Sequence, residues 1–128
     1  MNVVDSSGWL EFLTDGPNAE VFEEPLSDPS RLVVPVITVY EVFKKILLER
    51  DETAGLEAVA LMQQGELVNI EASTALSAAK LSLEERLPMA DALILATARQ
   101  RRAVLWTQDR DFEGLEGVRF VGKRSERA

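Results

Sequence analysis

The chain has 128 residues, of which 46% are hydrophobic, and its formal net charge at pH 7 is −8. A chain of this length and apolar content can bury one hydrophobic core, so we expect residues 1–128 to form a single domain. The chain contains no cysteine and no histidine, which excludes disulfides, thiolate or imidazole metal sites and histidine-based catalysis and leaves carboxylates, hydroxyls, lysines and arginines for any chemistry.

The N-terminal sequence shows no sign of a targeting or membrane segment. It lacks a basic start, and the acidic residue Asp5 comes directly after two valines. The longest apolar run, "LVVPVITVY", has 9 residues, which is too short to span a bilayer. We therefore expect a cytoplasmic protein without membrane association, whose acidic balance favours solubility.

Short β-branched runs alternate with longer runs of helical periodicity, which is typical of βαβ units. From the N-terminus, the pattern predicts a strand at Asn2–Val4, a helix after Ser6 or Ser7, an acidic helix around Pro17–Glu24 and a strand at Leu32–Val34. Helices at Val39–Arg50 and Thr53–Gln64 come next, then the short strand "ELVNI". Helices at Ser73–Glu85 and Pro88–Arg101, the buried strand "AVLWT" and the edge strand "VRFVG" complete the chain. These elements predict an α/β sandwich with a mostly parallel sheet.

Asp91 is the single charge in the stretch from Ala90 to Ala98. At helical spacing it shares a face with Ile94, Leu95 and Ala98, which normally points toward a core. A carboxylate there must be paired, hydrogen-bonded or bound to a cation, because an isolated buried charge costs too much. The alternative is structural: Pro88 suits a first helical position, and an acid one turn later complements the helix dipole.

Two further aspartates follow predicted strands, where parallel sheets bind their ligands. Asp5 follows "NVV", and Asp109 lies just past "AVLWT". Each also has a structural alternative. Asp5 could simply cap the next helix, and Asp109 and Asp111 in "TQDRDFEG" could be ordinary turn residues.

Glu41 looks structural by periodicity alone. The stretch "TVYE" matches a capping box with Thr38 as the cap, and Lys45 lies four residues on for a surface ion pair. A helical wheel places Glu41 opposite an apolar face. This pattern predicts a solvated side chain.

Acids at the ends of different α/β elements could nevertheless converge on one cleft. Two carboxylates about 4 Å apart repel by about 4 kcal/mol at an effective dielectric constant near 20, so such a cluster needs a cation. Ligands that are all oxygen favour Mg²⁺ or Mn²⁺. The implied chemistry is metal-assisted hydrolysis of a phosphodiester.

Four stretches in order, "NVVDSSGWLEFL", "ITVYEVFKK", "LPMADALILATA" and "LWTQDRDFEGL", resemble the motifs of PIN-domain ribonucleases. Their order and the chain length look most like the VapC toxins of toxin–antitoxin pairs. The resemblance implies a PIN-like three-layer sandwich whose central, mostly parallel, five-stranded sheet is flanked by helices. It also implies an RNA-cleaving enzyme, a cognate VapB-type antitoxin and a homodimer.

Carried over by position, the resemblance makes four acids the catalytic and metal-binding quartet: Asp5, Glu41, Asp91 and Asp109. Ser6 and Thr107 match hydroxyl residues beside them, and Asp111 matches a further acidic position. The quartet is expected to hold one or two Mg²⁺ or Mn²⁺ ions that activate water. It is the resemblance, and not helix geometry, that places Glu41 in this set.

The net negative charge is awkward for an RNA-binding protein. A local basic rim can still guide phosphates, because exposed charges more than about 8 to 10 Å apart are largely screened at physiological salt. Candidate rim residues are Arg99, Arg101, Arg102 and Arg110. The alternative for each is an ordinary charge at a helix end or in a loop.

Two other classes of protein fit part of the pattern. A phospho-receiver-like signalling domain shares the length and an acidic pocket, but it predicts an acid where Ser6 stands and a lysine where Thr107 ends its strand. A non-catalytic PIN binding module would keep the fold and lose the carboxylates, which are all present.

Overall fold

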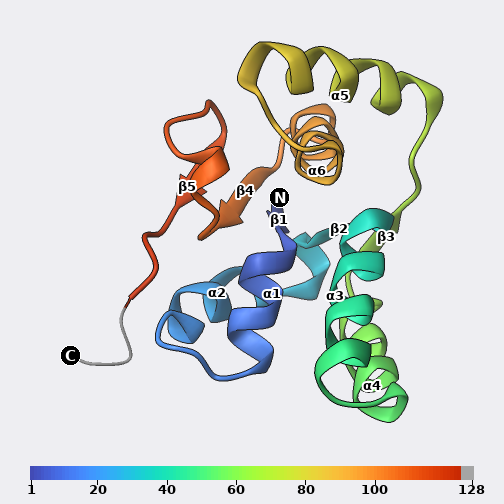
Figure 1. Cartoon of the computed structure of the whole chain (residues 1–128), viewed down its shortest axis with the longest axis vertical. Helices are drawn as coiled ribbons and strands as arrows, with labels where there is room; N and C mark the ends of the chain where they lie inside the picture. Colours follow the sequence, from blue (N-terminus) through green and yellow to red (C-terminus); the bar gives the residue numbers. More distant parts are fainter. Residues whose placement is uncertain (125–128) are drawn as a thin grey trace.

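The computed structural model describes residues 1–124 and alternates short strands with helices along the chain (Figure 1). The strands are β1 (Asn2–Val4), β2 (Val33–Pro35), β3 (Glu66–Val68), β4 (Val104–Thr107) and β5 (Val118–Phe120). The α-helices are α1 (Ser6–Leu13), α2 (Ala19–Leu26), α3 (Val36–Glu49), α4 (Glu52–Met62), α5 (Ala72–Glu85) and α6 (Met89–Gln100). Short 3₁₀ turns at Pro29–Arg31 and Arg110–Phe112 connect them. None of the helices in residues 1–124 is both long and apolar enough to cross a membrane.

All strand pairs among the described residues are parallel, as expected. In one sheet β4 lies between β1 and β5, and in the other β2 pairs with β3. A single bridge between Asn2 and Leu32 joins the two sheets. The prediction of one continuous five-stranded sheet is wrong in this respect. Strands of three or four residues offer few positions for pairing, and β1 and β2 meet only at the single bridge between Asn2 and Leu32.

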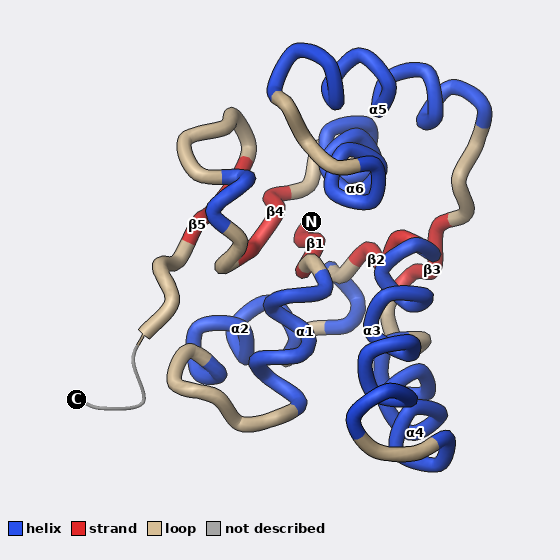
Figure 2. The backbone as a smooth tube through the Cα atoms, in the orientation of Figure 1, coloured by secondary structure: helices blue, strands red, loops and turns tan. Residues whose placement is uncertain are grey.

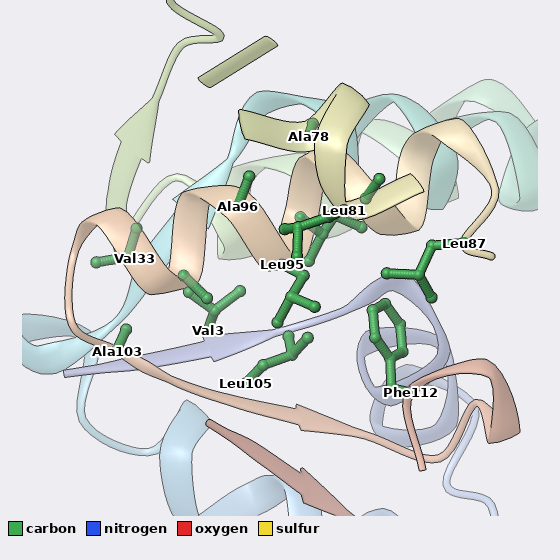
Figure 3. Packing of buried hydrophobic residues seen from close by; sticks show 13 residues of the cluster. Val3, Val33, Ala78, Leu81, Leu87, Leu95, Ala96, Ala103, Leu105 and Phe112 are labelled. Atoms are coloured by element: carbon green, nitrogen blue, oxygen red, sulfur yellow. The ribbon is translucent and has the colours of Figure 1, made fainter. Parts of the chain in front are cut away.

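The strands separate two layers of helices, because successive strand side chains point to opposite faces. Val3, Val33 and Leu105 belong to one core, which α5 and α6 cover from one side (Figure 3). Their neighbours on the same strands, Val4, Val34 and Trp106, pack instead in a second core that contains residues of α1, α2, α3 and α4. The predicted three-layer sandwich is thereby confirmed, and both faces of the sheet are buried.

Most predicted elements are present, with shifted ends. The clearest correction concerns α3, which begins at Val36 and not at Val39, with Pro35 at its N-cap. Proline at this position lacks an N–H and restricts the backbone of the residue before it to the extended region, so the strand ends and the helix begins with no loop between them. Thr38 is therefore a buried residue inside the helix and not a cap.

The strand order positions the site. The sheets and the bridge together give the spatial order β3, β2, β1, β4, β5. β2 and β3 extend the sheet to one side of β1, and β4 and β5 extend it to the other side, so the strand order reverses between β1 and β4. Such a reversal leaves a crevice at the carboxyl ends of the two central strands. In the tube view of Figure 2, α1 follows directly from β1, and α3 follows directly from β2. The first turns of these helices therefore lie at that same edge.

Candidate active site

Acidic side chains from four separate elements meet at the carboxyl ends of β1 and β4. Asp5 follows β1, Asp109 lies just beyond β4, Asp91 is in the first turn of α6, and Glu41 is in α3. The negative charges of Asp109, Asp5, Glu41 and Asp111, in decreasing order, all raise the pKa of Asp91. The sequence-predicted quartet and Asp111 therefore lie within electrostatic range of one residue.

Asp5 is the most deeply buried of these acids, with 3% of its surface exposed. One carboxylate oxygen accepts hydrogen bonds from Ser7 Oγ at 2.7 Å and from the backbone N–H of Gly8 at 3.0 Å. The other oxygen accepts from Thr107 Oγ1 at 2.7 Å. Asp5 thus caps α1, as its structural alternative predicted, and it is also held in a fixed orientation toward the acidic cluster.

Burial decides the protonation of Asp5. Desolvation raises its pKa from 3.8 to about 6, against the lowering effect of the hydrogen bonds from Thr107, Ser7 and Gly8. The negative charge of Asp109 adds to the increase. A carboxylate with three donors would normally have a low pKa, so the remaining increase shows that burial outweighs these hydrogen bonds.

Thr107 links the two strand ends. Its hydroxyl donates to Asp5 and accepts a hydrogen bond from the backbone N–H of Asp109 at 2.9 Å. Asp109 in turn accepts from the backbone N–H of Asp111 at 2.9 Å, so it also has the turn role that was its structural alternative. The turn orients the carboxylates of Asp109 and Asp111 toward Asp91.

Three carboxylates are close enough to share an ion. Oxygens of Asp91, Asp109 and Asp111 all lie within 4.8 Å of one another. Burial, followed by the surrounding negative charges, raises the pKa of Asp91 from 3.8 to about 7. Asp111, predicted only as a secondary position, is nearer to Asp91 and Asp109 than the sequence suggested.

Glu41 does not have the structural role that helix periodicity indicated. It accepts a hydrogen bond from the hydroxyl of Ser6, the first residue of α1. Lys45, its expected ion-pair partner, pairs with Glu49 at 2.9 Å instead. The capping-box and surface-pair interpretations of Glu41 are therefore wrong. Packing of α1 against α3 turns this side chain toward the cluster.

The donor set fits a hard divalent cation. The candidate ligands are all carboxylate oxygens, the type that Mg²⁺ and Mn²⁺ prefer. No ion pair within residues 1–124 involves Asp5, Glu41, Asp91, Asp109 or Asp111. Uncompensated carboxylates at this spacing are costly at neutral pH, and a bound cation would offset their repulsion.

Sequence reasoning missed a polar network behind the acids. Ser7 donates to Asp5 and accepts from the backbone N–H of Gln108 at 3.2 Å. The fully buried amide of Asn18 donates to the side chain of Gln108 and to the backbone oxygen of Gly122, each at 3.0 Å. The sequence held one local sign of this network, because Ser7 is only two residues after Asp5 in "DSS". Nothing in the sequence pairs Asn18 with Gln108, because they are 90 residues apart.

The candidate basic rim is mostly elsewhere. Arg99 is in the last turn of α6, about 12 Å along the helix from Asp91 at 1.5 Å per residue, and Arg101 and Arg102 come just after the helix ends. Arg99 donates to the backbone oxygen of Glu116, and Arg101 pairs with Glu66. Only Arg110, between Asp109 and Asp111, is brought next to the acids. It makes a long contact of 3.9 Å with Glu113.

Comparison with known proteins agrees with this architecture. Similar solved structures include a toxin–antitoxin complex from Klebsiella pneumoniae, with 24% identity and a TM-score of 0.82 over 97% of this chain and 100% of that chain. The sarcin–ricin loop cleaving toxin VapC20 of Mycobacterium tuberculosis has 16% identity and a TM-score of 0.77 over 98% and 100%. DNA-bound VapBC from Salmonella typhimurium has 19% identity and a TM-score of 0.75 over 95% and 98%.

At identities this low, the structural similarity establishes likeness of fold alone. No curated protein matches the chain significantly. A family model described as the PIN domain matches residues 3–118. Since this match spans nearly the whole sequence, the chain belongs to the PIN-domain family.

Proposed function

We propose that this protein is a Mg²⁺- or Mn²⁺-dependent endoribonuclease, the toxin of a VapBC-type toxin–antitoxin pair that acts in the cytoplasm. One observation carries the proposal: carboxylates from four elements converge at the carboxyl ends of the two central strands, with three of them within 4.8 Å of one another. The similar structures are toxins or toxin–antitoxin complexes, which supports the assignment of the RNA-cleaving class and of an antitoxin partner.

The residues have separate tasks in this proposal. Asp91, Asp109 and Asp111 would hold the ion, with Asp5 and Glu41 completing the negative site. A divalent ion bound there would lower the pKa of a water molecule and offset charge on the scissile phosphate. Thr107 and Ser7 keep the Asp5 carboxylate in one orientation, and Ser6 does the same for Glu41.

The same comparison supports a proposal about binding partners. The VapBC structures from Salmonella typhimurium and Rickettsia felis are complexes bound to DNA. We infer that this chain is bound by a small VapB-type antitoxin, and that the toxin forms a homodimer. Arg110 is the basic residue best placed for an RNA phosphate, whereas Arg99, Arg101 and Arg102 could contact only a more distant part of a long RNA.

The phospho-receiver alternative loses its support, because the chain belongs to the PIN-domain family and β4 ends in threonine, not lysine. The non-catalytic binding module remains the alternative that an experiment must separate from the nuclease. Its prediction is simple: the protein would bind Mn²⁺ and yet cleave no RNA.

The test is RNA cleavage by the purified protein with Mg²⁺, with Mn²⁺ and with EDTA. We expect cleavage with either ion and none with EDTA. Asp91→Asn and Asp109→Asn should each reduce the rate at least 100-fold, since each loses a charge from the ion site. Asp15→Asn is the matched control, because Asp15 is exposed, lies beyond the far end of α1, and has a φ of 53° that asparagine tolerates.

Two results would contradict the proposal. Cleavage that persists in EDTA, or that survives in both Asp91→Asn and Asp109→Asn, would exclude the metal mechanism. Tight Mn²⁺ binding without cleavage of total cellular RNA, transfer RNA or ribosomal RNA would favour the non-catalytic module instead.

A further inference from the structure

One exposed side of α3 begins at the acidic cluster and has a different chemistry from it. Lys44, Lys45 and Leu48 lie three, four and seven residues after Glu41, so the four side chains share a stripe on the helix. Together with Tyr40 they line a shallow hollow of about 200 Å³. The stripe covers about 10 Å of helix from Glu41 to Leu48, at 1.5 Å per residue.

Besides Glu41 and Leu48, the lining of the hollow combines an aromatic ring with two lysines, one of which has no acidic partner among the described residues. Tyr40, the only tyrosine of the chain, is 57% exposed, so its ring is accessible from solvent. The ammonium group of Lys44 lies 5.6 Å from the centre of its ring. Lys44 forms no ion pair within the described chain, whereas Lys45 is occupied by Glu49. The exposed part of the Tyr40 ring does not contribute to the hydrophobic core, and Lys44 has no acidic partner within residues 1–124, so neither side chain has an evident packing role.

This combination suits single-stranded nucleic acid. Bases that are not paired stack on exposed aromatic rings, and cations beside them contact the backbone phosphates. An exposed face of Tyr40 offers the stacking surface, and Lys44 offers the phosphate contact. Both lie in the turn of α3 that also holds Glu41, so a strand bound there is continuous with the candidate cleavage site.

We propose that Tyr40 and Lys44 form a subsite for single-stranded RNA, in which one base next to the scissile phosphate stacks on Tyr40 and a neighbouring phosphate contacts Lys44. This inference rests on the proposed nuclease function, because it concerns the RNA strand that would enter the acidic site. It makes a claim about binding that can be measured without cleavage.

The single tyrosine gives a direct readout. With ¹³C-labelled tyrosine, the protein has one set of tyrosine ring signals in NMR spectra, and EDTA prevents metal-dependent cleavage. A single-stranded oligoadenylate should shift the Tyr40 ring signals upfield at low salt, because a stacked base shields the ring. An abasic oligonucleotide of equal length carries the same phosphates without bases, and it should cause little of this shift.

Variants measure the two contacts separately. Tyr40→Ala should weaken binding of the oligonucleotide roughly 5- to 150-fold, and Tyr40→Phe should keep most of the affinity, because stacking needs the ring and not the hydroxyl. Leu83→Ala is the control for losing an exposed large side chain, since Leu83 is 85% exposed on α5. Lys44→Gln should reduce the slope of log affinity against log salt by about 0.7, the value for one phosphate on a single strand. Lys80→Gln, an exposed lysine on α5, should leave the slope unchanged.

The outcomes separate this inference from the proposed function. A Tyr40 shift with oligoadenylate in a protein that cleaves no RNA would support the subsite and contradict the nuclease. Metal-dependent cleavage with the same KM in Tyr40→Ala as in the unchanged protein would support the nuclease and contradict the subsite. If Tyr40→Ala alters only the capture of a co-expressed antitoxin and not RNA binding, this surface docks protein, and the RNA assignment is wrong.

Discussion

Asp91 is the residue at which burial and charge act most strongly together. Its pKa is raised to about 7, first by desolvation and then by the charges of Asp109, Asp5, Glu41 and Asp111. In the unfolded chain the same carboxyl group has a pKa near 3.8. The folded, metal-free protein therefore holds a proton that the unfolded chain releases between about pH 4 and pH 7.

The sign of the stability effect follows from this difference. Because the folded state binds more protons in that window, the unfolding free energy contributed by Asp91 is greatest at low pH and falls as pH rises to about 7. Asp91→Asn removes the effect. Because Asp91 is only partly buried, solvent screening leaves a small part of the effect that the full pKa shift would give. At pH 8 in EDTA, we expect this variant to unfold at a temperature roughly 3 to 5 °C higher than the unchanged protein, for a gain of about 1 kcal/mol.

The measurement is thermal unfolding of both proteins from pH 4 to pH 8.5. The difference in unfolding temperature should be near zero or reversed at pH 4, should grow through pH 7 and should then stay constant. Asp15→Asn, with its exposed side chain, should follow the unchanged protein at every pH. An Asp91→Asn protein that is less stable than the unchanged one at pH 8 would mean that the acids are not in electrostatic conflict.

Thr107 holds the second buried acid. Its side chain is fully buried and connects Asp5 to the backbone of Asp109. Thr107→Val keeps the shape and removes both bonds, which leaves a buried carboxylate oxygen and a backbone N–H without partners. We expect a loss of about 1 to 3 kcal/mol of unfolding free energy, measured by urea denaturation. Thr53→Val, at an exposed threonine on α4, should cost much less, and equal losses would show that the hydroxyl of Thr107 has no special role.

Chain order singled out Asp5 and Asp109, and helical periodicity singled out Asp91, but periodicity failed for Glu41. Asp5 and Asp109 could be placed because each follows a strand, and Asp91 because it stands alone on an apolar helical face. Glu41 could not be placed from its helix, since its position depends on Ser6 in α1, 35 residues away. A helical wheel describes one helix and cannot show which neighbour covers its polar side.

At the scale of elements, helix and strand identity followed from the spacing of apolar residues, whereas the ends did not. The run "LVVPVITVY" shows the reason. It contains one whole strand and the start of one helix, and both are apolar because both are covered by other elements. Without a polar break, only the proline marks the boundary, and the helix begins three residues before the start that the capping pattern had indicated.

Close contact between α1 and its neighbours gives a prediction for Gly8. A Cβ atom added there would lie 2.6 Å from Val4 Cγ1 and 2.7 Å from Phe22 Cδ1, and both of these residues are buried. Alanine favours a helix over glycine by about 1 kcal/mol, but overpacking of a buried contact costs about 1 to 3 kcal/mol. We therefore expect Gly8→Ala to lower the unfolding free energy by about 1 kcal/mol.

Chemical denaturation of Gly8→Ala and Gly122→Ala tests this packing argument. A Cβ at Gly122 meets no atom within 4 Å, so that substitution should be close to neutral. If Gly8→Ala were more stable than the unchanged protein, helix propensity would outweigh packing, and α1 would not be as tightly held against β1 and α2 as the structure indicates.

For the whole molecule, the parallel arrangement and the three layers could be predicted because apolar strands alternate with amphipathic helices. The division of the strands into two sheets joined at Asn2 and Leu32 could not, since strand spacing in the sequence carries no information on how far a ladder continues. The position of the site depends little on that detail. Five carboxylates meet because β1 and β4 are neighbours and the helices that follow β1 and β2 begin at the same edge.

This convergence links metal binding to proton release over the whole site. Metal-free protein near pH 6.5 retains protons on Asp91, whose pKa is about 7, and on part of the Asp5 population, whose pKa is about 6. Carboxylates must be deprotonated to bind a cation, so binding should release roughly one proton per molecule at pH 6.5 and almost none at pH 8.5. Apparent affinity should increase with pH over the same range.

Calorimetric titration with Mn²⁺ in two buffers of different ionisation enthalpy counts these protons. The same ion should also raise the unfolding temperature, because a ligand at 100 times its dissociation constant stabilises the folded state by about 2.7 kcal/mol. In Asp91→Asn, both the stabilisation and the proton release at pH 6.5 should fall sharply, whereas Asp15→Asn should behave as the unchanged protein does. Binding that releases no proton at pH 6.5 would place the ion away from Asp91, and the acids would then owe their proximity to the fold alone.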